Sequence, residues 1–324
     1  MNKHSLVLRK DYEVTRWTMG ALDGILLLNK PKGLTSHDCV VKIRKLLNEK
    51  KVGHTGTLDP NASGILPICI GRATKVAEYM ANYPKTYEAT ISLGAATTTE
   101  DCSGDIIEEK KIESPIRLEL LKSVLADMQG TITQVPPMYS AVKVDGKRLY
   151  KYALEGKTVQ RPARKVKIYR IELLTNHEID SQQRSFSIRV ACSKGTYVRT
   201  LAVDIGKKLG YPAHLAELIR TKSGPFALEH AVTFQEIQEA ASNGKIEKIL
   251  HPIDKAVSHF EKKIVPDHLA AKIENGAVIP QVGRMENKRY AIYNADGELL
   301  AIYIPHPKKP GFIKPEKMIK VKKN

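Results

Sequence analysis

Apolar residues occur along the chain both in short runs and in strict alternation, and both patterns predict strands. Residues 24–28 and 64–70 are continuous apolar runs bounded by glycine, which is typical of strands buried on both faces. Residues 86–94 alternate instead, with Tyr87, Ala89, Ile91 and Leu93 on one face and polar side chains on the other. This segment is therefore expected to be a strand with one buried face.

Apolar residues three and four positions apart predict helices between these strands. Ser36 is the expected cap of a helix that carries Val40, Ile43 and Leu47 on one side. A second helix is expected to open at Ser114-Pro115 and to end at Gly130. The pattern predicts a third over residues 196–209, ended by Gly210, and the capping box from Thr233 to Glu236 predicts a fourth.

The remaining segments complete a mixed α+β chain without regular βαβ alternation. A hairpin turn is expected at Asp145-Gly146, and further strands at residues 165–174 and 185–191. Beyond about residue 255 the pattern changes to a short helix at 266–274, two strands at 289–293 and 299–304, and a lysine-rich end. We therefore expect an N-terminal extension (1–20), a large domain (21–255) and a small β-rich domain (256–324).

Charge and cysteine usage narrow the functional classes. The 324 residues contain 52 Lys and Arg against 35 Asp and Glu, a net charge of +17, which favours a polyanionic partner such as nucleic acid or an acidic membrane surface. The apolar runs are far too short to span a bilayer. Four cysteines without a CxxC pair indicate reduced thiols in a cytoplasmic protein.

The segment 53–64 is the most unusual in the chain. Its glycines permit close backbone approach, and Pro60 biases Asp59 toward an extended conformation, so that its carboxylate is presented on a loop. The residues alone also allow an ordinary turn, because Asp and Asn favour turns through hydrogen bonds to their own backbone. On composition alone, the turn is the better interpretation.

Several known chemistries do not fit this segment or the rest of the chain. A phosphorylated-aspartate motif would need Asp and Lys where Gly53 and His54 stand, and a P-loop at residues 156–158 would need glycine at Lys151. No second acid stands near Asp59 in sequence for glycoside hydrolysis, and the zinc motif HExxH does not occur.

The same segment resembles the signature of the TruB family of tRNA pseudouridine synthases. Four further blocks agree in order and spacing, at residues 24–39, 136–156, 192–210 and 214–226. Agreement over five blocks favours the catalytic interpretation of Asp59 over the turn. The sequence departs from the family at Leu154, where an arginine is expected, and in the leader before Met19. The resemblance implies a pseudouridine synthase fold, a mixed and mainly antiparallel sheet flanked by helices, with a PUA-like C-terminal RNA-binding domain.

The resemblance also assigns roles to six residues. It makes Asp59 the nucleophile, Arg199 its positive partner, and Tyr87 an active-site tyrosine that stacks on the target base. Tyr197 and Leu218 would line the uracil pocket, although on sequence alone both are ordinary core residues. His54, on an exposed loop, would stack in the space that an extruded base leaves.

The activity implied is isomerisation of uridine to pseudouridine in the TΨC loop of tRNA, at position 55, by a cytoplasmic monomer. The reaction needs no cofactor and no metal, since substrate and product are isomers. Alternatives are a tRNA-binding or tRNA-folding factor without catalysis, and a relative of archaeal or eukaryotic type that is guided by a separate RNA. Lys320 to Lys323 either contact phosphates or form a solvated tail. Asn29-Lys30-Pro31 is expected to be a turn that supports the Asp59 loop.

Overall fold

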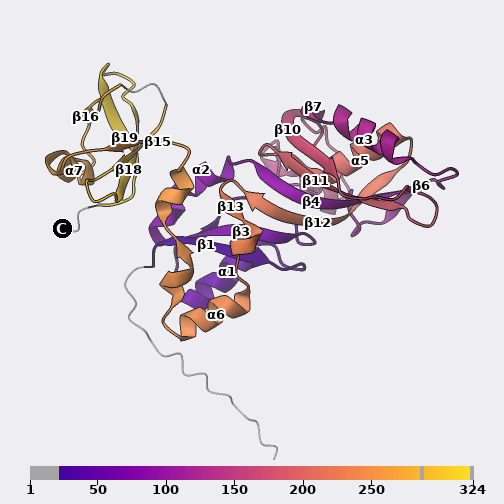
Figure 1. Cartoon of the computed structure of the whole chain (residues 1–324), viewed down its shortest axis with the longest axis horizontal. Coiled ribbons are helices and arrows are strands. Elements are labelled where there is room, and N and C mark those ends of the chain that lie inside the picture. Colours follow the sequence, from indigo (N-terminus) through magenta and orange to yellow (C-terminus); the bar gives the residue numbers. More distant parts are fainter. Residues whose placement is uncertain (1–21, 285–287, 322–324) are drawn as a thin grey trace, which may run out of the picture.

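The fold consists of a large domain built on one long sheet and a small C-terminal domain beside one end of it (Figure 1). The computed structural model describes residues 22–284 and 288–321. The expected N-terminal extension and the last two lysines of the C-terminal tail lie outside the described residues. Within the described part, no helix is long and apolar enough to cross a membrane.

The large sheet has ten strands, and every strand pairing in it is antiparallel except that of β3 with β12. The α+β class and the mainly antiparallel sheet are thus confirmed. Its main path runs through β14 (Leu250–His251), β1 (Gly24–Lys30), β3 (Ser63–Ile70), β12 (Ala213–Ser223), β4 (Lys85–Leu93), β11 (Ser185–Cys192), β10 (Arg164–Leu173) and β7 (Gly130–Gln134). Two short strands join it from the side, β2 (Val52–His54) on β3 and β13 (Phe226–Ala227) on β12.

Helices cover this sheet, and their positions explain the apolar patterns of the strands. Leu26 and Leu28 of β1 pack into the core under α1 and α6, whereas Ile25 and Leu27 face the opposite core. Both faces of β1 are therefore buried, as its continuous apolar run predicts. The apolar residues Ala89, Ile91 and Leu93 of β4 are buried against α3 and α5 and alternate with partly exposed residues, and Lys85 at the start of the strand is buried as well. The helices of the large domain are α1 (Ser36–Leu47), α2 (Ala77–Ala81), α3 (Leu118–Asp127), α4 (Leu149–Leu154), α5 (Val198–Leu209) and α6 (Phe234–Ser242).

The predicted elements agree with the structure in their centres and differ at some helix starts. Thr35, not Ser36, caps α1, because Asp38 completes a capping box with Thr35. The helix expected from Ser114-Pro115 begins only at Leu118, since Ile116 forms a bridge with Ile179, and Gly130 opens β7. The helix expected from residue 196 begins at Val198. The capping box at Thr233 and the turn at Asp145-Gly146 are confirmed.

Short 3-10 helices and two small hairpins fill the connections. The four 3-10 helices are η1 (Gly71–Val76), η2 (Leu228–His230), η3 (Ile246–Ile249) and η4 (Ile253–Val257). The hairpins are formed by β5 (Ala95–Thr97) with β6 (Ile106–Glu109), and by β8 (Lys143–Val144) with β9 (Lys147–Arg148).

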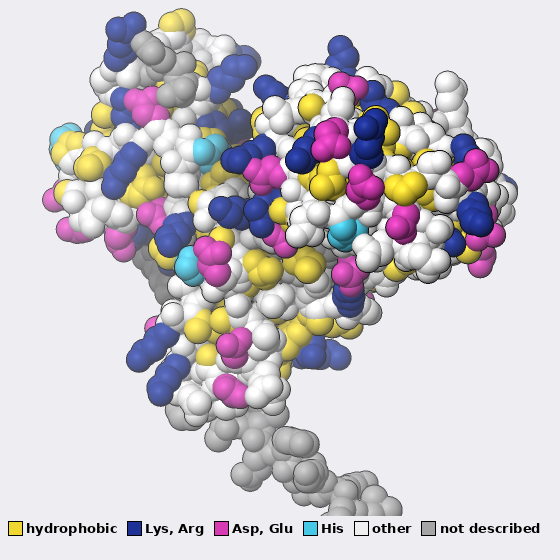
Figure 2. All heavy atoms as spheres, turned by 45° about the vertical axis from the view of Figure 1, so that its right-hand side comes forward, with side chains coloured by type: hydrophobic (Ala, Val, Ile, Leu, Met, Phe, Trp, Pro, Cys, Tyr) yellow, Lys and Arg dark blue, Asp and Glu magenta, His cyan; other side chains and the backbone are white. Residues whose placement is uncertain are grey.

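The C-terminal domain is a five-stranded sheet with the helix α7 (Asp267–Glu274). Its strand order is β15 (Glu261–Ile264), β17 (Tyr290–Tyr293), β18 (Leu299–Pro305), β19 (Phe312–Met318) and β16 (Ile279–Pro280). It shares an apolar core with η1 and α2 of the large domain, and Tyr79 of α2 donates a hydrogen bond of 2.7 Å to Glu316 of β19. Lys and Arg side chains are spread over both domains on the face seen in Figure 2.

Candidate active site

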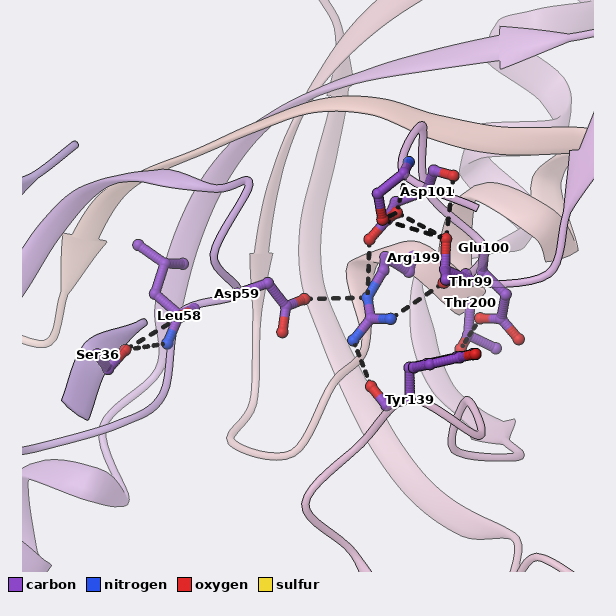
Figure 3. A network of polar contacts seen from close by, with 10 residues as sticks. Ser36, Leu58, Asp59, Thr99, Glu100, Asp101, Tyr139, Arg199 and Thr200 are labelled. Atoms are coloured by element: carbon purple, nitrogen blue, oxygen red, sulfur yellow. Dashed lines mark hydrogen bonds and ion pairs between the residues drawn. The ribbon is translucent and has the colours of Figure 1, made fainter. Parts of the chain in front are cut away.

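The loop that carries Asp59 connects β2 to β3 and is anchored on the side that faces α1. The Ser36 hydroxyl accepts a hydrogen bond of 2.8 Å from the Leu58 amide and donates one of 3.1 Å to the Leu58 carbonyl. The Leu58 side chain is buried in the core of the large domain. The side chain of the next residue, Asp59, is partly exposed. Its backbone position is fixed by the anchored Leu58 before it (Figure 3).

Two fully buried cations hold the backbone on both sides of Asp59. The Lys30 ammonium donates to the carbonyls of Pro31, Leu34 and Pro60, the last at 3.2 Å. The Arg220 guanidinium donates to the carbonyl of Ile65 at 2.8 Å and to that of Gly56 at 3.3 Å. Burial lowers the pKa of Lys30, and the nearby charge of Asp59 opposes that shift. Lys30 therefore supports the Asp59 loop, as expected, but the turn expected at Asn29-Lys30-Pro31 is wrong, because Asn29 and Lys30 are the last residues of β1 and pair with β3.

Asp59 and Arg199 form an ion pair between this loop and the first turn of α5. The distance from Arg199 Nε to Asp59 Oδ2 is 2.9 Å, and Figure 3 shows the two side chains pointing toward one another. The guanidinium is 6% exposed and also donates to the carbonyls of Thr99 and Tyr139, at 3.0 and 2.9 Å. Charge-assisted hydrogen bonds of this kind fix the direction of the planar group. The carboxylate keeps 38% exposure, so it is open to a ligand.

A second acid, Asp101, lies 3.9 Å from the same Arg199 nitrogen. Its carboxylate accepts hydrogen bonds from the hydroxyls of Thr99 and Ser103 and from the Ser103 amide. Burial by itself would raise the pKa of Asp101, but these hydrogen bonds and the charge of Arg199 together hold it below its usual value. Asp101 is thus engaged within its own turn, and Asp59 is the carboxylate that faces the open space.

A cavity of about 270 Å³ lies beside this ion pair. The paired strands β4 and β12 form one side of this cavity. Tyr87 of β4 lies directly opposite Arg220 of β12, and Ala89 lies opposite Leu218, so these side chains share one face of the sheet. Tyr197 lines the cavity from the start of α5, and Gln134 binds both the amide and the carbonyl of Tyr197. Burial raises the pKa of the Tyr87 hydroxyl, while the charge of Arg220 acts in the opposite direction.

The structure brings five of the six predicted residues to this one cavity, namely Asp59, Tyr87, Tyr197, Arg199 and Leu218. His54 lines a wider adjoining hollow that also contains Asp59 and Arg199. The expected exposed loop position of His54 is wrong: it is the last residue of β2 and is partly buried. Burial, and then the charge of Arg220, lower the pKa of His54, which favours the neutral imidazole.

Sequence reasoning missed several charged residues at the site, namely Lys85, Asp101, Lys194 and Arg220. Lys85 precedes Tyr87 by two positions on the alternating strand, and this spacing was a usable signal that it shares the tyrosine's face. Arg220 lies in β12, which was not predicted because two register shifts, between Leu215 and Glu217 and between Arg220 and Lys222, break its alternation.

Comparisons with known proteins agree with this geometry. Residues 44–198 match the family model described as TruB family pseudouridylate synthase (N terminal domain), and residues 199–258 match that of the tRNA pseudouridylate synthase B C-terminal domain. The chain is 51% identical over 302 residues to tRNA pseudouridine synthase B of Bacillus pumilus, and 54% over 298 residues to that of Halalkalibacterium halodurans. Each match covers 92% of this chain and 98% of the relative.

Two solved structures that resemble this chain are those of complexes. The crystal structure of a Cbf5-Nop10-Gar1 complex contains a chain with a TM-score of 0.71 and 29% identity, which covers 92% of this chain and 85% of that chain. The structure of an H/ACA RNP bound to a substrate RNA containing 2'-deoxyuridine gives a TM-score of 0.69 and 27% identity, with 91% and 84% covered. The boundary between the two family models falls at residue 198, so Asp59 and Arg199 are matched by different models.

Proposed function

The chain belongs to the TruB family of pseudouridylate synthases, and from this we propose that it converts uridine to pseudouridine in tRNA at position 55 of the TΨC loop. The relatives at about half identity are named tRNA pseudouridine synthase B, which supports tRNA as the substrate. The observation that carries the proposal is the Asp59–Arg199 pair at the mouth of a cavity lined by Tyr87 and Leu218.

Asp59 is the nucleophile of this reaction. Its carboxylate is held by Arg199 at 2.9 Å yet remains 38% exposed, which suits a group that must form and release a bond with the sugar. Hydrogen bonds to two backbone carbonyls hold the Arg199 guanidinium in place, and its ion pair with Asp59 fixes the direction of the carboxylate. The family reaction detaches uracil from the ribose, rotates it and rejoins it through C5, so neither a cofactor nor a metal takes part.

Tyr87, Tyr197 and Leu218 bind the detached base. The Tyr87 ring provides a surface on which the uracil stacks, and its hydroxyl helps to remove the C5 proton. Leu218 from β12 and Tyr197 from the start of α5 enclose the base from neighbouring elements. A cavity of about 270 Å³ fits one nucleotide rather than a segment of stacked RNA.

The uridine must leave the folded loop to reach Asp59, and flipping costs a few kcal/mol. His54 lines the hollow outside the cavity, where a neutral imidazole stacks in the space that the base vacates. The excess of 17 positive charges supplies attraction to phosphate groups along the T-arm.

Residues 21–255 form the catalytic domain and residues 256–324 a PUA-like domain that adds RNA contacts. Of the C-terminal lysines, Lys320 forms ion pairs with Glu298 and Glu274, which leaves less of its charge for RNA, whereas Lys322 and Lys323 lie outside the described residues. The enzyme acts alone as a monomer in the cytoplasm, where its four free cysteines stay reduced.

Release of tritium from tRNA labelled at C5 of uridine tests this function. An unmodified tRNA transcript should release label in proportion to pseudouridine formed, and a transcript with the T-loop uridine replaced should release none. A tRNA-binding factor without catalysis would bind both transcripts and release no label from either. That result would refute the proposed function.

A further inference from the structure

Lys85 is a buried cation in the cavity to which the proposed function gives no role. It is 7% exposed and lies on β4 two residues before Tyr87, so period-two geometry places both side chains on the same face of the sheet. Both line the cavity of about 270 Å³ together with Asp59. Ser223 lies directly opposite Lys85 on β12, and the buried Arg220 lies opposite Tyr87, close enough for its charge to act on Lys85.

The contacts of Lys85 leave its charge without a counterion. Its ammonium donates two hydrogen bonds of 2.7 Å, to the carbonyls of Ala81 and Tyr83. Within residues 22–284 and 288–321 no carboxylate lies within ion-pair distance of Lys85 or of Arg220, and the third ammonium proton of Lys85 has no acceptor there. Two buried positive charges therefore stand at this end of the cavity with backbone carbonyls and the Tyr87 side chain as partners, and with no carboxylate of the described residues at ion-pair distance.

Two buried positive charges close together are unfavourable when the cavity holds no ligand, and they become favourable when the cavity holds an anion. Burying a charge without a counterion costs free energy, and two like charges add to that cost. An anion that forms only during a reaction, in a site that excludes water, is stabilised strongly by charges already held in place. The cavity should therefore bind a species that becomes negative in the course of the reaction.

The proposed reaction generates an anion of this kind. When the bond between C1′ of the ribose and N1 of uracil breaks, its electron pair leaves with the base, which then carries one negative charge over N1 and its carbonyl oxygens. When C5 bonds to C1′, the bond between C1′ and the Asp59 oxygen breaks and the negative charge returns to the carboxylate; C5 then loses its proton and N1 gains one. Lys85 need neither give nor take a proton, so the substrate and product remain isomers.

We propose that Lys85 is a further catalytic residue, whose ammonium stabilises the negative charge of the uracil while the base is detached from the ribose. Arg220 contributes positive potential from the adjacent strand, in addition to its contacts with the Asp59 loop. The inference rests on the proposed function and extends it, because it assigns the stabilisation of the leaving base to a residue outside the Asp59–Arg199 pair.

The surroundings of Lys85 make its charge depend on pH in an accessible range. Burial, followed by the charge of Arg220, lowers the pKa of Lys85 to about 8, and Lys194 acts in the same direction. Cys192, which pairs with Lys85 on the neighbouring strand β11, opposes this lowering of the Lys85 pKa. Burial raises the pKa of the Cys192 thiol itself to about 11. Burial also raises the pKa of Tyr87, which shares the Lys85 face of β4. Lys85 is thus charged at pH 7 and largely neutral at pH 9.

A purely structural role is the competing explanation, since Lys85 also ties the end of α2 to β4. Single-turnover rates of pseudouridine formation and tRNA dissociation constants separate the two roles. We expect Lys85→Met to lower the rate by roughly 10²–10³ while the dissociation constant changes by less than about threefold. Lys85→Arg should recover at least about tenfold of that loss, because it restores a positive charge.

The pH profile gives a second readout. The wild-type rate should fall about tenfold between pH 7 and pH 9, and Lys85→Arg should lack this fall because its charge persists. Lys122→Met, at an exposed position in α3, removes one positive charge away from the cavity and should match the wild type in both measurements.

The inference is overturned if Lys85→Met reacts within about threefold of the wild-type rate, or if Lys85→Arg retains the alkaline fall. If Lys85→Met does not fold, the profile of Lys85→Arg decides alone. Wild-type protein that forms no pseudouridine on any tRNA would instead remove the proposed function itself, so the two failures are distinguishable.

Discussion

Gly64 and Arg220 are partners in the parallel pairing of β3 with β12, and an ideal Cβ atom at Gly64 would lie 2.3 Å from the Arg220 carbonyl oxygen. The φ angle of Gly64 is +107°, a conformation that side chains rarely adopt. The same Arg220 contacts the carbonyls of Gly56 and Thr57. The Asp59 loop is thus held at both of its ends against one residue of β12.

Gly64→Ala should displace β3 from β12 and disturb the Asp59 loop. We expect a loss of about 2 kcal/mol or more in the free energy of unfolding, from backbone strain and overlap together, and a fall in turnover. Gly33→Ala is the matched control: its φ is +88°, but nothing lies within 4 Å of the new Cβ, so only strain of about 1 kcal/mol applies. Equal losses of stability in urea unfolding would contradict the close-contact account.

Both the charge and the planar shape of the Arg199 side chain should be required for turnover. Arg199→Met leaves the Thr99 and Tyr139 carbonyls without this donor, which should cost about 1–3 kcal/mol of stability and remove nearly all turnover. Arg199→Lys keeps the charge, but a single ammonium cannot reach both carbonyls and Asp59 in the same geometry. We expect Arg199→Lys to regain stability more fully than turnover. Thermal unfolding and single-turnover assays measure the two; full turnover in either variant would exclude the assigned role.

The contact between the two domains should weaken in acid. Hydrogen bonds from Arg289, followed by that from Tyr79, hold the pKa of Glu316 below its usual value of 4.5, although burial opposes this. A carboxyl with a depressed folded-state pKa stabilises the protein above its unfolded pKa and loses that contribution as pH falls through the folded value. Glu316→Gln should therefore destabilise the protein at pH 7, by about 1 kcal/mol or less because Arg289 is 43% exposed.

The difference between wild type and Glu316→Gln should shrink as pH is lowered below about 4.5. Thermal unfolding of both proteins between pH 3 and pH 7 measures it. Lys317→Met, which removes an ion pair with Glu78, whose side chain is 60% exposed, serves as the comparison and should show little effect at any pH. A difference that grows in acid would contradict the assigned sign.

Much of the fold followed from local patterns. The strands expected at 165–174, 185–191, 289–293 and 299–304 differ from β10, β11, β17 and β18 by at most one residue at each end. The apolar residues of these strands lie at the positions that the fold buries, either every second residue or in a continuous run, so the sequence pattern predicts the strand. The strand β19 escaped notice because Lys314, Glu316 and Lys317 are partly buried in ion pairs and sheet contacts rather than facing solvent. Two expected helix starts were wrong because distant residues bind there: Leu58 contacts Ser36, and Ile179 forms a bridge with Ile116.

The site was less accessible to such reasoning. Composition favoured a turn for Asp59, and only the resemblance to a family singled out Asp59 and Arg199, which lie far apart in the chain. Their 2.9 Å contact depends on Ser36, Lys30 and Arg220, none of which signals its carbonyl or amide partner in the sequence. Lys85 was missed despite its spacing of two from Tyr87, because a lysine at the start of a strand is ordinarily exposed.

The central claim is that the Asp59 carboxylate performs the reaction, and Asp59→Asn tests it most directly. The amide preserves shape and removes the nucleophilic charge, so we expect pseudouridine formation on tRNA to fall to background while the dissociation constant for tRNA stays within about tenfold of the wild type. Asp127→Asn, an exposed acid at the end of α3, should leave the rate unchanged. Pseudouridine formed by Asp59→Asn at the wild-type rate would contradict the account.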